Sequence, residues 1–131
     1  MARYSTYWKF IPTRMVREYK RLKKDHSLQA QLYVGAINTT IELTKLIQDG
    51  EARNRLVNMV YIEKTHTIEG AGMKMYLSRS TVAKWVGEFV DMLSYLAGFT
   101  DFIPPIYRQV YRQTSQKQIK FIDDIQARTT H

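Results

Sequence analysis

Residues 67–97 read TIEGAGMKMYLSRSTVAKWVGEFVDMLSYLA, and this stretch decides the fold that we expect for the chain. Its pattern predicts two helices joined by a tight turn. A short helix at about 68–75 would be followed by a turn at 76–77. Ser78 would then cap a second helix, because a serine hydroxyl readily accepts a hydrogen bond from an amide in the first helical turn. The stretch therefore predicts a helix-turn-helix unit.

Apolar residues that recur with the helical period of about 3.6 residues predict the second helix of this unit. Ala71 and Gly72 supply small side chains where the two helices would cross. Tyr76 departs from the pattern, since this turn often holds glycine and a bulky residue in a left-handed conformation is costly. We therefore expect the turn to have another geometry. The apolar stripe consists of Val82, Trp85, Val86, Phe89, Leu93 and Leu96.

Polar residues gather at the N-terminal end of the second helix, on its outer face. In helix-turn-helix proteins this end enters the DNA major groove, where its side chains contact base edges or phosphates. The alternative interpretation is an ordinary helical hairpin with small residues at a tight crossing. The first candidates for DNA contact are Arg79, Ser80, Thr81 and Lys84.

The composition favours one basic and mainly helical domain. The chain has 131 residues, 44% of them hydrophobic, with only six glycines and three prolines. Its 20 basic and 12 acidic residues give a net charge of +8, which is typical of proteins with an anionic partner, most often nucleic acid. Without cysteine there is no disulfide or thiolate metal site, and no apolar run approaches the ~18 residues that span a bilayer. We expect a cytoplasmic protein without a membrane partner.

Residues 1–27 form a predicted basic arm and helix. Residues 1–24 contain eight basic residues and a single acidic residue, Glu18. Pro12 and Thr13 predict the start of a helix whose apolar stripe is Met15, Val16, Tyr19 and Leu22. One interpretation is that this helix follows DNA phosphates, and the alternative is that it packs on the core. Further candidate DNA contacts, here and beside the helix-turn-helix, are Arg14, Arg17, Lys20, Arg21, His66 and Lys74.

The remaining segments complete the prediction of an all-α helical bundle with flanking N- and C-terminal helices. Residues 28–99 form its predicted central domain, which includes a third helix at 51–65 ahead of the helix-turn-helix. Gly98 is the expected stop of the second helix of that unit. A C-terminal helix is predicted at 106–128, and its aromatic and aliphatic faces offer a surface for self-association.

Helical periodicity also predicts a helix at 28–48. Asp49 and Gly50 would close it, because glycine commonly follows the end of a helix. We expect this helix to pack between other helices or against a copy of itself. Its predicted inner side consists of Leu28, Leu32, Tyr33, Ala36, Ile37, Thr40, Ile41, Thr44 and Ile47. Gly35 would mark a close contact between helices, since glycine costs about 1 kcal/mol relative to alanine inside a helix.

Catalytic and metal-binding chemistry has no candidate residues in this sequence. The three histidines, at 26, 66 and 131, have no partner at metal-ligand or catalytic spacing. Four carboxylates could be imagined as a metal site, but their spacing does not support one, because adjacent helical residues point apart. We interpret them as parts of solvated helix faces. The four residues are Glu88, Asp91, Asp123 and Asp124. We expect a protein that is not an enzyme and holds no cofactor or metal.

Three runs of the sequence resemble small regulators from phages of Gram-positive bacteria: VYIEKTHTIEGAG at 60–72, LSRSTVAKW at 77–85 and LAGF at 96–99. These regulators are late-transcription activators of the ArpU and RinA kind and similar lactococcal phage proteins. Their C-terminal half resembles the promoter-reading domain of sigma factors. The resemblance covers about residues 51–99.

The resemblance implies a sequence-specific regulator of late phage genes that binds double-stranded DNA, touches host RNA polymerase and acts in the bacterial cytoplasm. By position, the base- and phosphate-facing residues would be Arg79, Ser80, Thr81 and Lys84. Two alternatives stay open, namely a small terminase-like packaging protein and a structural helical protein that binds no DNA. Because operators are often palindromic, we also expect a homodimer through 28–48 or 106–127, with the C-terminal helix preferred.

Overall fold

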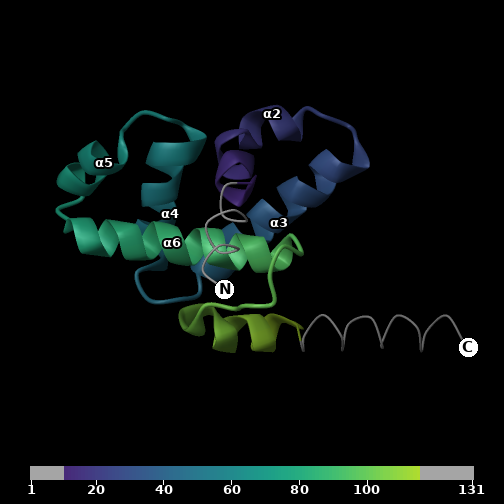
Figure 1. Cartoon of the computed structure of the whole chain (residues 1–131). Helices are drawn as coiled ribbons and strands as arrows, with labels where there is room; N and C mark the ends of the chain where they lie inside the picture. Colours follow the sequence, from purple (N-terminus) through teal and green to yellow (C-terminus); the bar gives the residue numbers. More distant parts are fainter. Residues whose placement is uncertain (1–10, 116–131) are drawn as a thin grey trace, which may run out of the picture.

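The computed structural model describes residues 11–115, and every regular element within that range is a helix. The predicted all-α fold is thereby confirmed. None of the helices in this range is long and apolar enough to cross a membrane. The elements are a helix at residues 11–17, α2 (Tyr19–Lys23), α3 (Leu28–Thr44), α4 (Gly50–Val57), the π-helical η1 (Asn58–Ile62), α5 (Ile68–Lys74), α6 (Arg79–Leu96) and a helix at 105–115 (Figure 1).

The long helix α6 is the axis of the fold. Helices α4 and α5 pack along its N-terminal half, and α3 packs against its C-terminal half (Figure 1). The helix at 105–115 runs beside it, on the side away from α2 and α5. Through this position α6 contributes side chains to three apolar clusters. They contain Val82 and Trp85, then Phe89 and Leu93, and finally Met92.

The apolar stripe predicted for α6 is confirmed, with four of its six members buried and Val86 and Leu96 half-buried. The sequence pattern missed a second buried side of the same helix. Met92 is fully buried there against Leu43 of α3 and Tyr107 of the helix at 105–115. Because α6 is covered on two sides, its C-terminal half has little exposed surface.

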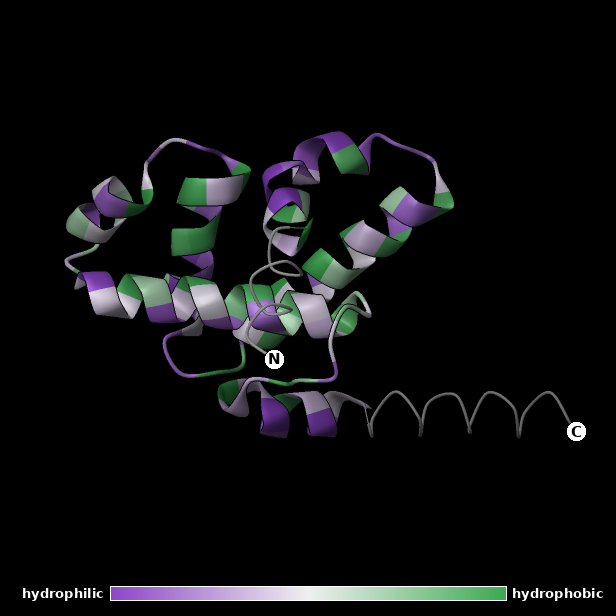
Figure 2. Cartoon of the chain, in the orientation of Figure 1, coloured by the Kyte–Doolittle hydropathy of each residue, from purple (hydrophilic) through white to green (hydrophobic). Residues whose placement is uncertain are grey.

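The N-terminal helices pack on the core with the stripe that the sequence predicts. Met15, Val16 and Leu22 are buried in the largest apolar cluster, while α2 is mostly hydrophilic along its length (Figure 2). Residue 11 is already helical, so the prediction that Pro12 begins this helix is wrong. Pro12 is itself buried, and it therefore serves packing as well as helix formation.

Helix α3 ends earlier than its sequence predicts, at Thr44 rather than at residue 48. Asp49 and Gly50 do not close it. Asp49 has a φ of 59° and precedes α4, and Gly50 is the first residue of that next helix. A Cβ atom on Gly50 would lie 2.1 Å from the carbonyl oxygen of Thr44. Glycine is required here because the start of α4 packs directly on the end of α3.

The outer face of α3 also differs from the prediction. Leu28 and Leu32, assigned by periodicity to the buried side, are 73% and 64% exposed. Gly35, expected at a close helix contact, has no atom within 4 Å of the place where a Cβ would lie. The other central members of the predicted side, Ala36, Ile37, Thr40 and Thr44, are buried as predicted, and the two threonine hydroxyls donate to carbonyls of their own helix.

Other boundaries moved by smaller amounts. The helix expected at 51–65 is α4 followed by the single π-helical segment η1, which ends at Ile62, and Thr67 caps α5 by accepting a hydrogen bond from the Gly70 amide. Gly98, with a φ of 86°, ends α6 as expected. The C-terminal helix begins at residue 105, one residue before its predicted start, and its predicted part at 116–128 lies outside the described residues.

Candidate nucleic-acid interface

The turn between α5 and α6 is built from two local hydrogen-bonding devices. At the start of α6, the Ser78 hydroxyl accepts a hydrogen bond from the Thr81 amide at 3.2 Å, as the sequence predicts. At the end of α5, the Leu77 amide donates to Gly72 O at 2.9 Å and the Tyr76 amide donates to Met73 O at 3.2 Å. This pair of bonds is the Schellman motif, which satisfies the last carbonyls of a helix.

Tyr76 takes the left-handed position that this motif requires. Its φ is 58°, which corrects our expectation that a bulky residue would impose another turn geometry. The side chain is 96% exposed, so no packing compensates for the backbone conformation. Gly98 occupies the equivalent place at the end of α6, where the Phe99 amide donates to Ser94 O and the Gly98 amide to Tyr95 O. The same helix-ending motif therefore occurs after α5 with tyrosine and after α6 with glycine in the left-handed position.

Small residues bring α5 and α6 into close contact, as predicted. Ala71 is fully buried, and a Cβ atom on the buried Gly72 would lie 2.9 Å from Val82 Cγ2. Any larger residue at position 72 would have to push Val82 away. The angle between the two helices thus depends on this glycine.

The outward face of α6 is exposed at its N-terminal end. Arg79, Ser80 and Lys84 project from it together with the exposed Ala83. Further along the same face, a Cβ on Gly87 would meet no atom within 4 Å. This face therefore combines two cations with two small residues that leave the helix backbone accessible.

Thr81 differs from the other predicted residues of α6. It is half-buried, and its hydroxyl accepts a hydrogen bond from Ser78 Oγ at 2.9 Å. The Ser80 hydroxyl lies 3.1 Å from the same Ser78 oxygen but remains exposed. Thr81 thus belongs to the cap of the helix, while Ser80 is available to an external partner.

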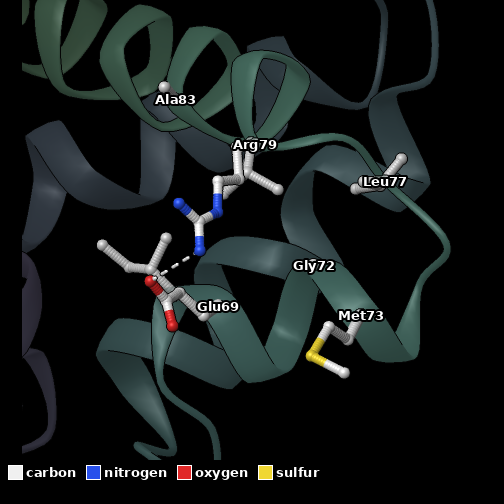
Figure 3. Close-up of a pocket in the computed structure, with 8 residues that line it drawn as sticks. Glu69, Gly72, Met73, Leu77, Arg79 and Ala83 are labelled. Atoms are coloured by element: carbon white, nitrogen blue, oxygen red, sulfur yellow. Dashed lines mark ion pairs between the residues drawn. The ribbon is translucent and has the colours of Figure 1, made fainter.

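Glu69 on α5 is a neighbour of Arg79 that the sequence pattern did not indicate. Its Oε1 lies 3.5 Å from Arg79 Nη2, and both side chains are largely exposed (Figure 3). Such exposed ion pairs contribute about 0–1 kcal/mol, so Arg79 can exchange this partner for another at low cost. The pair lines a cavity of about 330 Å³ between α5 and α6. It is lined by Ile68, Glu69, Gly72, Met73, Leu77, Arg79, Val82 and Ala83.

The predicted basic residues of the N-terminal helices lie on a different part of the fold. Figure 1 shows α2 over the C-terminal half of α6, away from α5 and the start of α6. Arg21 and Arg14 both contact Glu18, at 2.8 and 3.6 Å, and the hydrogen bond from Arg21 is the main reason why the pKa of Glu18 is lowered. Lys20 Nζ lies 2.7 Å from Glu63 Oε2, a partner that the sequence did not indicate.

The other predicted contacts have separate environments. Arg17 lies over the ring of Tyr61, 5.4 Å from its centroid. His66 is half-buried, and its Nδ1 lies 2.9 Å from Thr65 Oγ1. Lys74 is exposed in the last turn of α5, so it is accessible beside the α5–α6 turn. The structure thus groups Arg79, Ser80 and Lys84 on one helix and leaves Arg17 and the other cations of the N-terminal helices elsewhere.

Arg53 anchors the inner face of α6, and sequence reasoning missed it. The side chain of Arg53 is 6% exposed and lies 2.9 Å from Glu88 Oε1, whose side chain is 18% exposed. Arg53 also donates to Gln48 O at 2.9 Å, and its guanidinium carbon lies 5.1 Å from the ring centroid of Trp85. The interpretation of Glu88 as part of a solvated face is therefore wrong. No group of metal-ligating side chains occurs within residues 11–115.

Comparison of the chain with protein-family models, with curated protein sequences and with solved structures gives no match. The resemblance to phage late-gene regulators therefore stays a prediction from the sequence.

Proposed function

We propose that this protein is a sequence-specific DNA-binding protein in which α5 and α6 act as a helix-turn-helix and α6 enters the major groove. The observation that carries the proposal is the outward face of α6. Arg79, Ser80 and Lys84 stand exposed there at the N-terminal end, on a helix whose opposite face is fixed in the core. Exposed donors on a rigid helix end are the arrangement that base reading needs.

The shape of this face supports the same function. The major groove is about 12 Å wide and admits a helix of about 10–12 Å in diameter with its side chains. Ala83 is exposed and Gly87 has no side chain, so neither would hold the helix away from the base edges. A methyl group such as that of Ala83 can also contact the methyl group of thymine.

The two cations of this face suit different contacts. Arg79 at the first position of α6 can bond guanine with two parallel hydrogen bonds, because its guanidinium is a planar fork. Lys84 carries a single flexible ammonium, which suits a phosphate better than a base edge. Lys74 and His66 flank the motif and would supply further contacts to the phosphate backbone of DNA.

The basic N-terminal helices would contribute more weakly. Arg14, Lys20 and Arg21 already have carboxylate partners in the chain, and a phosphate would have to replace Glu18 or Glu63. Exposed pairs of this kind exchange readily. We therefore assign Arg14, Arg17, Lys20 and Arg21 to non-specific attraction, with the specificity placed on α6.

The biological role that fits is regulation of late genes of a phage or prophage in a bacterial cytoplasm, with host RNA polymerase as a further partner. This part of the proposal rests on the resemblance of residues 51–99 to late-transcription activators. A reporter gene behind the DNA site selected by the protein would test it, since activation should require both the site and Arg79.

The decisive experiment is selection of binding sites from a random DNA pool, followed by affinity measurements on the selected and on unrelated DNA. Arg79→Ala should reduce the preference for the selected site by about 1–3 kcal/mol, with a smaller effect on unrelated DNA. Lys84→Ala should weaken binding to both DNAs alike and reduce the slope of log affinity against log salt by about 0.9.

Lys45→Ala is the matched control, because Lys45 is an exposed lysine directly after the end of α3, has a carboxylate partner, Glu42, and lies off the α6 face. It should leave specific binding unchanged. If the pool yields no preferred site, or if Arg79→Ala and Lys84→Ala fold normally and bind with wild-type affinity, α6 does not read DNA.

A further inference from the structure

The outer face of α3 bears large apolar side chains that nothing in the described part of the chain covers. Leu28 is 73% exposed and Leu32 is 64% exposed. Gly35 and Thr39 are exposed on the same side, at the intervals of three and four residues that align side chains along one helix face. We call these four residues the α3 stripe.

The α3 stripe lies in a segment without charge. No lysine, arginine, aspartate or glutamate occurs from Leu28 to Ile41, although charged residues make up 24% of the chain. Exposed helix faces in soluble proteins are normally charged, and depletion of charge is the compositional mark of the centre of a protein interface. This part of the surface therefore has the composition of an interface.

Gly35 adds an independent feature. Glycine weakens the interior of a helix, and no contact with the rest of residues 11–115 requires it, because a Cβ would meet nothing within 4 Å there. A glycine on an exposed helix face allows another helix to approach closely. Large leucines beside an open glycine provide both the projection and the recess of a helix–helix contact.

We infer that the α3 stripe is the surface on which a second copy of this chain packs, as a two-fold antiparallel helix pair. With the axis near Leu32, the Leu32 side chains of the two copies meet each other, and Leu28 of each copy lies over Gly35 of the other. The contact is self-complementary, as a two-fold interface must be.

The absence of charge on the α3 stripe argues against a charged partner at this face. Two chains of net charge +8 repel each other, so they associate best through a face that carries no charge. A nucleic acid would gain nothing from such a face, because its affinity comes mainly from cations at phosphates. An acidic protein would likewise prefer the basic surfaces elsewhere on the chain.

The geometry is compatible with DNA binding but does not depend on it. In Figure 1 the N-terminal end of α3 lies on the opposite side of the molecule from α5 and the start of α6. Pairing through the α3 stripe would therefore leave both copies of the α6 face accessible. Helix α3 has 17 residues and is thus about 25 Å long. A contact along one helix of this length buries less surface than the roughly 800 Å² per partner of standard complexes. We accordingly expect a reversible dimer.

The test is sedimentation equilibrium of the full chain without DNA, over a series of micromolar concentrations. The wild-type protein should shift from monomer to dimer as concentration rises. Leu32→Lys and Gly35→Gln should each weaken dimerisation about tenfold or more, since the first places two charges at the axis and the second places a long side chain where Leu28 of the other copy would pack. Neither variant disturbs the monomer core, so circular dichroism should show unchanged helix content.

Two matched controls are available. Leu46→Lys changes a leucine that is also 64% exposed but lies beyond the end of α3, and Gly87→Gln changes a glycine on α6 where an added Cβ would likewise meet nothing within 4 Å. Both should dimerise as the wild type does. Higher salt should preserve or strengthen the dimer by screening the repulsion of the two chains, whereas it should weaken any binding to DNA.

A wild-type chain that stays monomeric at every concentration would overturn the inference. So would a dimer that Leu32→Lys and Gly35→Gln leave intact, a result that would instead favour the C-terminal segment at 106–127. Because no DNA is present, neither result depends on the proposed function of α6.

Discussion

Tyr76→Gly should make the protein more stable, although it removes a large side chain. Tyr76 holds the left-handed position of the Schellman motif at the end of α5 with a φ of 58°. For a residue with a Cβ atom this conformation costs about 1–2 kcal/mol. Glycine avoids that cost, and the loss of the ring removes little packing because the side chain is 96% exposed.

The expected gain is smaller than the relieved strain. Glycine has more freedom in the unfolded chain, which lowers stability by about 0.4–1 kcal/mol. The net increase in the free energy of unfolding should therefore be about 0.5–1 kcal/mol, or about 3 °C in melting temperature for a domain of this size. Gly98→Ala is the converse change in the same motif at the end of α6. At Gly98 φ is 86° and an added Cβ would meet nothing within 4 Å, so Gly98→Ala should lower stability through backbone strain alone.

Urea titration and thermal unfolding, followed by circular dichroism, would measure both changes. Tyr76→Ala is the discriminating control, because alanine removes the ring but keeps a Cβ atom in the left-handed conformation. It should stay within a few tenths of a kcal/mol of the wild type. A Tyr76→Gly variant that is less stable than the wild type would show that the turn is not strained and that the ring contributes to the fold.

Two further predictions concern buried polar groups. Arg53→Met should lower the free energy of unfolding by roughly 2–4 kcal/mol, because it leaves the Glu88 carboxylate without its guanidinium partner. In denaturation measurements, the double variant Arg53→Met/Glu88→Leu should recover part of this loss. Burial raises the pKa of Tyr107 to about 12, so the folded state keeps a proton that the unfolded state releases near pH 10. Stability should therefore fall between about pH 10 and 12, by up to about 2–3 kcal/mol. A pH series in which Tyr107→Phe has the same slope as the wild type would contradict this assignment.

Local features of the α5–α6 segment could be predicted from the sequence because they depend on residues close together in the chain. The Ser78 cap bonds an amide three residues away, and the stripe from Val82 to Leu93 follows one helical period. Gly72 could be assigned to the helix crossing for the same reason, since Val82 is brought back to it by a short turn. These contacts need no knowledge of the remaining fold.

Features that depend on distant residues could not be predicted in this way. The ion pair of Arg53 with Glu88 joins positions 35 residues apart, so no local sequence pattern connects the two residues. Gly50 has the sequence of a helix stop but acts as the first residue of α4, because its environment is set by the end of α3. The assignment of Leu28 to the core failed because periodicity identifies an apolar face without showing what covers it.

Helix α6 packs on the core with some faces and leaves another face exposed, so DNA binding and folding should be separable in this protein. The side chains that hold the helix, such as Trp85 under Arg53, lie on faces covered by α3, α4, α5 or the helix at 105–115. The exposed face at its start carries Arg79 and Lys84, whose loss removes no buried contact. A substitution that abolishes DNA binding on this face should therefore leave the melting temperature unchanged, whereas Trp85→Ala should reduce binding only through unfolding, at a cost of about 3–5 kcal/mol. A helix that is fixed on one side and accessible on the other can meet a groove without rearrangement, which is the property that sequence reading requires.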